Sequence, residues 1–177
     1  MLRRGSRTTT QVGIIPIDSR LIGRLTTVTV AIDLAHVHDA SATRLRSADQ
    51  LYTSGRRELV ELLASMGRPV TIPDLLAEQP KLTQSSVYRN LAMLESAGVV
   101  QKVVSTDDRA RFELAEDLMG HHHHLICVEC GRVDDFVVSP AAEHRIESIL
   151  ELAIADTGFQ PSGHRLDIVG TCIDCAN

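Results

Sequence analysis

Hydrophobic residues recur at helical spacing in the segment "YTSGRRELVELLASMG". Thr53 or Ser54 can cap this helix and Gly67 can end it, and its apolar side carries Leu59, Leu62, Leu63 and Met66. The next segment, "VTIPDLLAEQP", predicts a short helix with Thr71 as N-cap and Pro73 in the first turn, where proline is tolerated.

A third helix and two strands follow. In "LTQSSVYRNLAMLESAG", Thr83 caps a helix that Gly98 ends, and the buried stripe is Val87, Leu91 and Leu94. "VVQKVVS" and "ARFELA" are strand-like runs on either side of "TDDR", which is typical of a hairpin turn. Three helices followed by a β-hairpin predict a winged helix-turn-helix.

The pattern changes after Gly120. "HHHHLICVE", "RVDDFVVS" and "HRLDIVGTC" predict strands, and "PAAEHRIESILELAIADTG" predicts a helix whose apolar stripe is Ile146, Ile149, Leu150, Ala153 and Ile154. The predicted fold class is therefore α+β, an N-terminal winged helix-turn-helix followed by a small α/β dimerisation domain. We expect three parts: a flexible tail over 1–46, with a short helix possible late in it, a DNA-binding domain over 47–117 and a metal-binding dimerisation domain over 118–177.

Composition limits the location and the partners. No stretch of the 177 residues approaches the roughly 20 apolar residues that span a bilayer, and the N-terminus has no apolar run typical of a signal peptide. We therefore expect a cytoplasmic protein without a membrane partner. The net charge of −5 argues weakly against nucleic-acid binding. Binding would depend on placed cations, among them Lys102, Arg109 and Arg111 on the wing, and on dimerisation.

The cysteines form two C-x-x-C pairs, Cys127 with Cys130 and Cys172 with Cys175. Disulfides are rare in a reducing cytosol, and a single pair could be a redox motif. Two pairs separated by a domain-sized loop match a tetrahedral zinc site with four thiolates better. The sequence predicts structural zinc at these residues.

The four consecutive histidines can supply two metal sites. On a strand, side chains alternate between faces, so His121 and His123 point one way while His122 and His124 point the other. Each pair is about 7 Å apart along the strand, which one metal can bridge after side-chain rotation. Candidate partners are Glu113, Asp135, Glu143, Glu147 and His164. Imidazole and carboxylate ligands suit Zn, Fe(II), Mn, Co or Ni. The alternative is a polar strand without metal.

The third helix presents Ser85, Tyr88 and Arg89 on the side opposite its apolar stripe. Such a face suits the major groove of double-stranded DNA, where arginine can pair with a phosphate or a guanine edge. An ordinary solvated face is the alternative. The preceding helix and the following hairpin favour DNA binding.

Together, "SSVYRNLAMLESAGVV", "ARFEL", "HHHHLICVECG" and "HRLDIVGTCIDC" resemble the ferric uptake regulator family, from about Tyr52 to Cys175. The resemblance implies a dimeric, metal-responsive transcriptional regulator in which Tyr88 and Arg89 contact DNA. It implies a sensing site between the domains at Glu113, His122, His124 and Asp135. It implies a further site in the dimerisation domain at His121, His123, His164 and a helix glutamate, for which Glu147 is preferred over Glu143.

The sequence departs from two subgroups of that family. Iron- and peroxide-sensing members usually carry a histidine just before the second helix, where this chain has Pro69 or Val70. Actinobacterial zinc-uptake regulators supply an aspartate and a cysteine at positions that correspond to Gln101 and Ala115. His36 or His38 could complete the sensing site, or both could simply be solvated. The regulatory metal is therefore open: Zn or Fe(II) first, then Mn or Ni.

These features predict a metal-dependent DNA-binding repressor of metal homeostasis genes that acts as a homodimer. Two alternatives remain: a constitutive winged-helix DNA binder with only structural zinc, and a peroxide sensor of the same family. An enzyme is not expected, because the chain has no H-E-x-x-H motif and no glycine-rich phosphate loop. No small-molecule substrate is expected.

Overall fold

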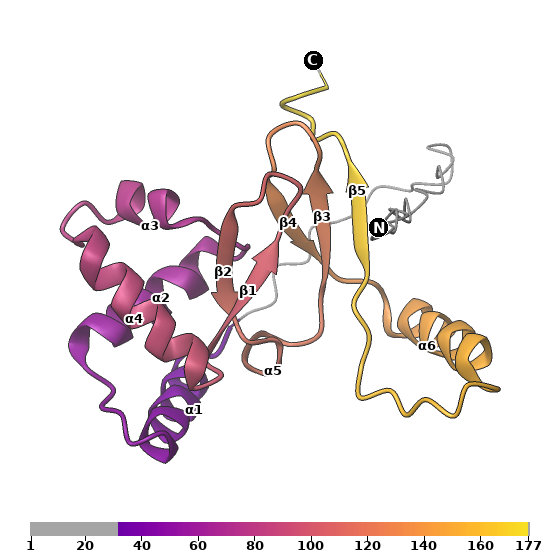
Figure 1. Cartoon of the computed structure of the whole chain (residues 1–177), viewed down its shortest axis with the longest axis horizontal. Helices are drawn as coiled ribbons and strands as arrows, with labels where there is room; N and C mark the ends of the chain where they lie inside the picture. The colour runs from indigo at the N-terminus through magenta and orange to yellow at the C-terminus, as the bar shows by residue number, and fades with distance from the viewer. Residues whose placement is uncertain (1–31, 177) are drawn as a thin grey trace, which may run out of the picture.

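The computed structural model describes residues 32–176. Figure 1 shows helices gathered on one side and a sheet with a separate helix on the other. The elements are α1 Leu34–Ser47, α2 Ser54–Met66, α3 Ile72–Glu78, α4 Gln84–Ser96, β1 Val100–Val104, β2 Ala110–Leu114, α5 Glu116–Met119, β3 His123–Cys127, β4 Val133–Phe136, α6 Pro140–Ile154 and β5 Asp167–Gly170.

The N-terminal part is a winged helix-turn-helix, as predicted. Thr71 forms a capping box with Asp74, whose carboxylate accepts the Thr71 backbone N–H at 2.8 Å, and this fixes the start of α3. The predicted stripes form most of the core, since α2 and α4 bury Leu59, Leu63, Val87, Leu91 and Leu94. The wing is the antiparallel β1–β2 hairpin.

Helix α1 corrects the predicted domain boundary. Val37, Ser41 and Leu45 of this helix are fully buried, and Val37 and Leu45 belong to the winged-helix core. The segment 34–46 is therefore part of the domain, and the expectation of a tail over 1–46 is wrong for these residues. The tail predicted over 1–31 lies outside the described residues. The signal in the sequence was the spacing of these three residues by four, following Asp33 as N-cap.

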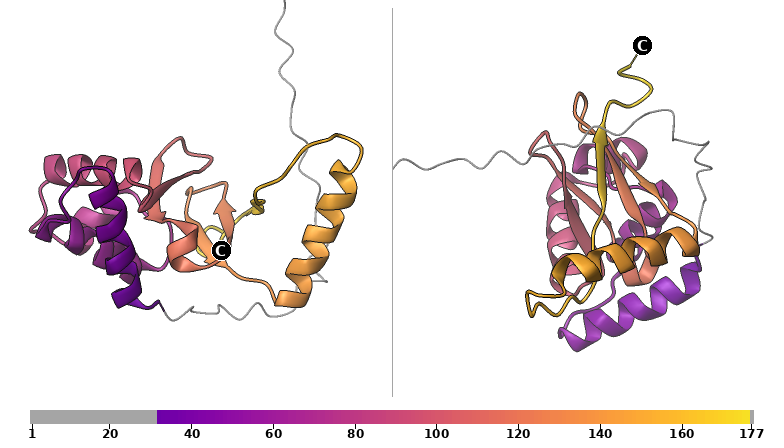
Figure 2. Two further views of the ribbon diagram at one scale, coloured as in Figure 1. Left: turned by 90° about the horizontal axis from the view of Figure 1, so that it is seen from below. Right: turned by 90° about the vertical axis from the view of Figure 1, so that its right-hand side faces the viewer.

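The C-terminal part contains a three-stranded sheet in the order β4-β3-β5. Strand β3 pairs antiparallel with β4 and parallel with β5, and the parallel register joins His124 to Asp167 and Cys127 to Gly170. Helix α6 stands away from the sheet in Figure 1 and in the left view of Figure 2, and it buries none of its residues. Among the described residues, no helix is long and apolar enough to cross a membrane.

The wing packs against the C-terminal sheet. Val103 of β1 is buried in a small cluster with Ile126 and Val133, and Val169 packs against it. In the hairpin turn, Ser105 donates to the backbone oxygen of Gly131 at 2.9 Å. The two domains therefore share a hydrophobic contact that the sequence pattern did not indicate.

Arg111 lies at the contact between the wing and the C-terminal sheet and is not exposed on the wing surface. Its side chain is 5% exposed and forms two hydrogen bonds with Asp107, at 2.7 and 2.9 Å. The bonds from the guanidinium lower the pKa of Asp107 to about 2. Lys102 pairs with Glu95 at 2.8 Å. The expectation that Arg111 faces DNA is therefore wrong.

We expect Gly131→Ala to lower the free energy of unfolding by about 2–4 kcal/mol, from overpacking together with a strained backbone. Gly131 has a φ of +71°, and a Cβ there would lie 2.4 Å from Asp107 Oδ2 and 2.8 Å from Arg111 Nη2. Asp107 cannot yield without breaking its bonds to Arg111. Gly158→Ala is the matched control, since it has the same φ but nothing within 4 Å of the added Cβ. Equal losses for both variants in thermal unfolding would contradict the close contact at Gly131.

Candidate metal centres

The described residues contain three groups whose ligand atoms converge. In each group, one ligand atom per residue lies within 4.8 Å of the others. We name them the four-cysteine site (Cys127, Cys130, Cys172, Cys175), the interdomain site (Glu113, His122, His124, Asp135) and the C-terminal site (His121, His123, Glu143, His164). The alternating direction of the histidines is as predicted, since neighbours along the strand belong to different groups.

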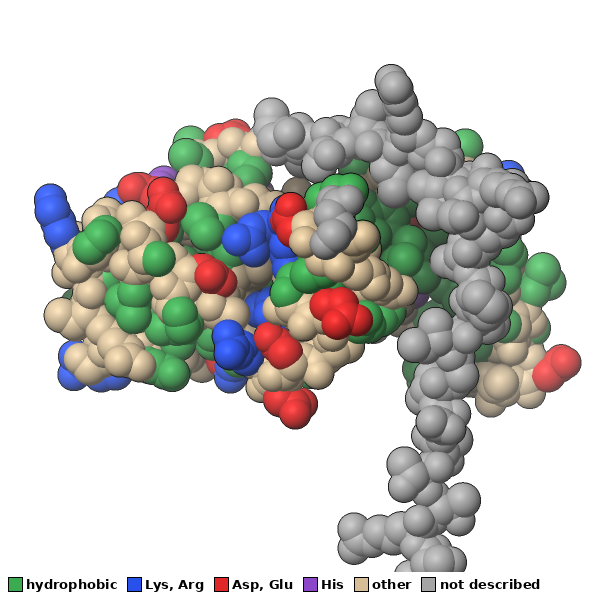
Figure 3. Space-filling view, turned by 90° about the horizontal axis from the view of Figure 1, so that it is seen from above, with side chains coloured by type: hydrophobic (Ala, Val, Ile, Leu, Met, Phe, Trp, Pro, Cys, Tyr) green, Lys and Arg blue, Asp and Glu red, His purple; other side chains and the backbone are tan. Residues whose placement is uncertain are grey.

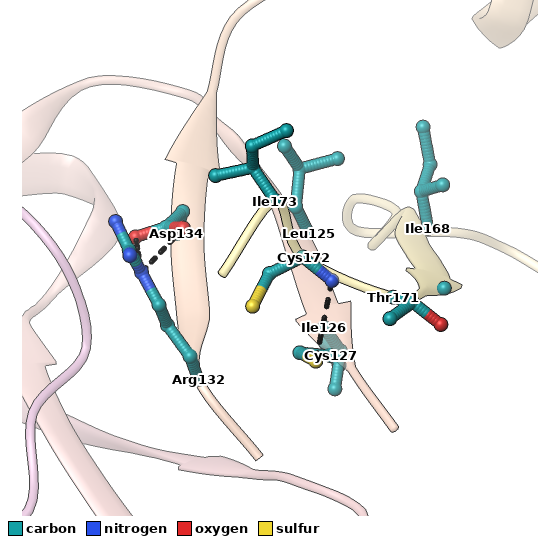
Figure 4. Close-up of a pocket in the computed structure, with 10 residues that line it drawn as sticks. Leu125, Ile126, Cys127, Arg132, Asp134, Ile168, Thr171, Cys172 and Ile173 are labelled. Carbon is teal, nitrogen blue, oxygen red and sulfur yellow. Dashed lines mark hydrogen bonds and ion pairs between the residues drawn. The ribbon is translucent and has the colours of Figure 1, made fainter. Parts of the chain in front are cut away.

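The four-cysteine site has the dimensions of a zinc tetrahedron. Cys130 Sγ lies 3.8 Å from Cys172 Sγ, and a tetrahedral zinc with thiolates at 2.3 Å has an edge of about 3.8 Å. All four cysteines are free of disulfides. Figure 4 shows the Cys172 backbone N–H donating to Cys127 Sγ, at 3.3 Å.

The thiols of this site need a cation to ionise together. Backbone N–H groups of Cys130 and Cys172 lower the pKa of Cys127 to about 6. Hydrogen bonds with Cys172 and Cys130 raise the pKa of Cys175 to about 12. One thiolate therefore forms readily, whereas the fourth requires a neutralising charge, as zinc supplies.

The interdomain site joins the wing to the C-terminal sheet. Glu113 comes from β2 and His124 from β3, His122 lies just before β3, and Asp135 comes from β4, where it pairs with His124 in register. Both His Nε2 atoms lie 3.3 Å from Glu113 oxygens, and they lie 4.0 and 3.8 Å from Asp135 oxygens. A tetrahedral zinc with N and O ligands has edges of about 3.4 Å. Asp135 Oδ1 is buried without a hydrogen bond, so the residues fit a metal ion.

In the interdomain site, the negative carboxylates and the positive imidazoles stabilise each other's charge. Burial would raise the pKa of Glu113, but hydrogen bonds from His122, His124 and Gln101 outweigh burial and lower it to about 2. The hydrogen bond to Glu113 raises the pKa of His122 to about 9. Burial would lower the pKa of His124, but the bond to Glu113 outweighs it and the pKa rises. Burial, with the charge of Glu113, raises the pKa of Asp135 to about 6. Without a metal, the protonated imidazoles therefore supply the positive charge that a bound metal ion would supply.

Metal affinity at the interdomain site is expected to rise with pH up to about pH 9. Below the His122 pKa of about 9, the incoming metal must displace a proton, so affinity rises about tenfold per pH unit and more steeply while His124 is also protonated. Zinc competition titrations between pH 6 and 10 measure this. ¹⁵N NMR of the metal-free protein gives the His122 midpoint. A midpoint near 6.5, with affinity flat above pH 7, would contradict the pairing with Glu113.

The C-terminal site uses Glu143 and not Glu147. Glu143 lies 3.0 Å from both His123 Nε2 and His164 Nε2, and 3.1 Å from His121 Nε2. His164 Nε2 forms no hydrogen bond with Glu143 despite the short distance, and His123 Nδ1 is buried without a hydrogen-bond partner. A bound cation would satisfy these atoms, so the group fits a cation. Glu147 is half exposed and contacts His144 at 3.9 Å. The preference for Glu147 is therefore wrong, because the α6 start at Pro140 places Glu143 on the side of the histidines.

Three polar residues contact the ligands of these sites but were not predicted to do so from the sequence. Gln101 Nε2 donates to Glu113 at 2.7 Å, and Asp167 lies 3.2 Å from His124 Nδ1. Glu116 contacts His121 Nδ1. Gln101 lies opposite Glu113 in the β1–β2 hairpin, a pairing that the length of the hairpin could have indicated. The other two contacts join elements that are not paired as a hairpin, so no local pattern indicates them.

The chain lacks the additional ligands that the two subgroups of the family supply. The interdomain site is therefore limited to its four side-chain ligands. Val70 is fully buried, bonded by its backbone to Phe112, and offers no ligand. His38 Nδ1 lies 2.7 Å from the Tyr52 hydroxyl and its Nε2 lies 3.2 Å from Glu61, so His38 neither completes the site nor is solvated. His36 is exposed, as expected for a solvated residue.

The recognition helix α4 leaves Ser85, Tyr88 and Arg89 exposed, as predicted, with Tyr88 at 55%. Tyr88 and Arg109 of the wing line the same cleft, next to the start of α3. Polar and cationic groups thus gather where helix and wing meet.

Comparison with known proteins agrees with this architecture. The sequence model of the ferric uptake regulator family matches residues 48–169. The peroxide operon regulator of Bacillus subtilis is 29% identical over 147 residues, covering 80% of this chain and 95% of the relative. The structure of the Vibrio cholerae ferric uptake regulator covers 73% of this chain and 98% of its own, with 27% identity and a TM-score of 0.57.

The structure of the Helicobacter pylori ferric uptake regulator has a TM-score of 0.63 over 88% of this chain and 98% of its own, at 21% identity. At that identity the likeness shows the fold alone. The match of the family over residues 48–169, with the winged helix and the C-terminal sheet, settles membership. The chain belongs to the ferric uptake regulator family and is a transcription regulator, not an enzyme.

Proposed function

We propose that this protein is a dimeric, metal-dependent repressor that acts in the cytoplasm on genes of metal homeostasis. Zinc in the four-cysteine site holds the C-terminal domain together. A second, exchangeable divalent metal binds the interdomain site and adjusts DNA affinity.

The observation that carries this proposal is the origin of the interdomain ligands. Glu113 belongs to the wing of the DNA-binding domain, whereas His122, His124 and Asp135 belong to the C-terminal domain. A metal held by all four restrains the wing relative to the sheet. In a dimer, this restraint sets the spacing of two recognition helices on successive major grooves. A near-complete switch requires about 10⁴-fold tighter metal binding in the DNA-competent state.

Zinc is the effector that the donor set favours. The site offers two imidazole nitrogens and two carboxylates, and the described residues around it supply no fifth side-chain ligand. Four ligands of this kind suit tetrahedral zinc, while Fe(II) and Mn more often take further ligands. Fe(II) remains the second candidate, followed by Mn and Ni.

An uncovered apolar surface supports the homodimer. Ile149, Leu150 and Leu152 of α6 are 65%, 40% and 79% exposed. The left view of Figure 2 shows α6 apart from the sheet. Figure 3, seen from above, shows a further patch of hydrophobic side chains just to the right of the middle of the molecule. Exposed apolar surface of this kind marks an interaction site, and symmetric pairing of two chains is the commonest way to bury it.

Leu152→Asp is expected to weaken dimerisation at least 100-fold, because it places a charge in a buried apolar contact. Analytical ultracentrifugation over a concentration series measures the dissociation constant. Leu51→Asp is the matched control, since Leu51 is 78% exposed but lies next to α2, far along the chain from α6. A dimer unaffected by Leu152→Asp, or weakened equally by both variants, would exclude α6 from the interface.

Fluorescence anisotropy with the DNA upstream of the protein's own gene tests the function. Protein that retains its cysteine-bound zinc is titrated anaerobically with Zn, Fe(II), Mn and Ni. We expect one metal to raise DNA affinity at least 100-fold. Arg89→Ala is the control, because α4 presents this exposed side chain to DNA while it contacts no metal group. It should bind metal normally and lose DNA. High affinity that no metal changes would indicate a constitutive DNA binder.

Peroxide sensing is the second candidate, because relatives at 27–29% identity are named peroxide regulators. The described structure has buried Val70 where a histidine would be expected in such members. Treating the Fe(II)-loaded protein with hydrogen peroxide tests this. Loss of DNA binding with oxidation of His122 or His124 would support it, and retained binding would exclude it.

A further inference from the structure

The two histidines of the interdomain site use their ring nitrogens in the same way. His122 Nδ1 lies 2.9 Å from the backbone oxygen of Gly120, and His124 Nδ1 lies 3.2 Å from Asp167 Oδ1. Their Nε2 atoms both face Glu113. A carbonyl or carboxylate oxygen can only accept, so each Nδ1 carries a hydrogen. In the neutral ring, the lone pair is then on Nε2, facing the other ligands.

Asp167 reaches His124 because of the strand register. Strands β3 and β5 run parallel, with His124 directly opposite Asp167. The Asp167 side chain is 32% exposed and lies outside the interdomain group itself. Arg165 Nε also donates to Asp167 Oδ1, at 3.1 Å. Asp167 therefore touches the site through one atom of His124, on the side away from the other ligands.

We propose that Asp167 is the positioning residue of the interdomain site. It accepts the Nδ1 hydrogen of His124, holds the ring with Nε2 toward the metal and so sets the affinity of the site. The inference rests on the proposed metal binding there and adds how that binding is tuned. Carboxylates in this position raise the basicity of the ligating imidazole, and removing one typically lowers metal affinity 10- to 100-fold.

The position also gives the site a connection to the rest of the domain. The Nδ1 partner of His122 is Gly120, two residues earlier, whereas the Nδ1 partner of His124 lies 43 residues away on β5. The orientation of His124 therefore depends on the pairing of β3 with β5. A displacement of β5 withdraws Asp167, lets the ring rotate and lowers the metal affinity without touching any ligand.

The test compares Asp167→Ala with Asp167→Asn in a Glu143→Ala, His164→Ala background, which leaves only two ligands of the C-terminal site. Zinc affinity is measured by competition with a chromophoric chelator, and ¹⁵N NMR reports which nitrogen of His124 carries the hydrogen or binds zinc. Asp167→Ala should lose 10- to 100-fold in affinity and show a mixture of tautomers when metal-free at high pH. Asp167→Asn keeps an oxygen that accepts the same hydrogen. It should retain the tautomer and lose less than about fivefold.

Arg165→Ala is the matched control, since it removes the other donor to Asp167 and leaves the bond to His124. It should change zinc affinity less than threefold. Parental affinity and tautomer in Asp167→Ala, or an equal loss in Arg165→Ala, would overturn the inference. Loss of the cysteine-bound zinc in Asp167→Ala would overturn it too, because the residue would then support the strand in general. If zinc binds but DNA affinity does not respond, the proposed function fails while the role of Asp167 stands.

Discussion

Replacing His122 and His124 together with alanine is expected to abolish the response of DNA binding to the effector metal. The two rings supply both nitrogen ligands of the interdomain site, and neither carboxylate can bind a metal tightly alone. A wild-type response of at least 100-fold corresponds to about 2.7 kcal/mol of coupling between metal and DNA. We expect less than threefold to remain, measured by anisotropy with and without metal.

The strand itself provides the matched control. His121→Ala with His123→Ala removes the same number of imidazoles from the same run of histidines, but from the C-terminal site. This variant should keep at least a tenth of the metal response. Both variants should retain one zinc per chain in the four-cysteine site. A normal response in the first variant, or equal losses in both, would show that metal does not act through the interdomain site.

Cys172→Ser is expected to have the largest effect on stability. The described C-terminal domain buries little of its own: Ile126 and Val133 share a cluster with Val103 of the wing, and α6 buries nothing. In zinc-finger peptides the metal supplies roughly 10–16 kcal/mol of folding free energy. We expect the variant to lose its tightly held zinc, to lower the melting temperature by more than about 10 °C and to fail to dimerise.

Metal analysis, calorimetry and ultracentrifugation measure these three results. Glu143→Ala is the comparison, because it removes one ligand of the C-terminal site while the four cysteines stay. It should retain the zinc and melt within about 3 °C of the wild type in the absence of added metal. A zinc-free Cys172→Ser variant with wild-type stability would show that the four-cysteine site does not hold the domain together.

Local patterns predicted what depends on local spacing. Thr71, Thr83 and Gly67 bound their helices as expected, and the alternation of His121 to His124 separated two groups. Each of these follows from the geometry of one helix or strand. The winged helix could be predicted for the same reason, since its core comes from periodic stripes.

The errors concern contacts between elements. Glu143 and Glu147 are one helical turn apart, and only the placement of α6 decides which faces His123. Arg111 was expected on the wing surface because the hairpin pattern does not reveal that its turn packs against Gly131. Asp167 reaches His124 through a parallel strand pairing, which no short spacing encodes.

The parallel pairing of β3 with β5 also implies an order of assembly. It joins Cys127 to Gly170 at one end and His124 to Asp167 at the other, and Cys172 follows two residues after the pairing ends. Zinc bound by the cysteines would close the long loop between these strands and so lower the entropic cost of placing Asp167 opposite His124. We therefore expect a chain that has already bound zinc at its cysteines to form the interdomain site more readily than a chain that has not.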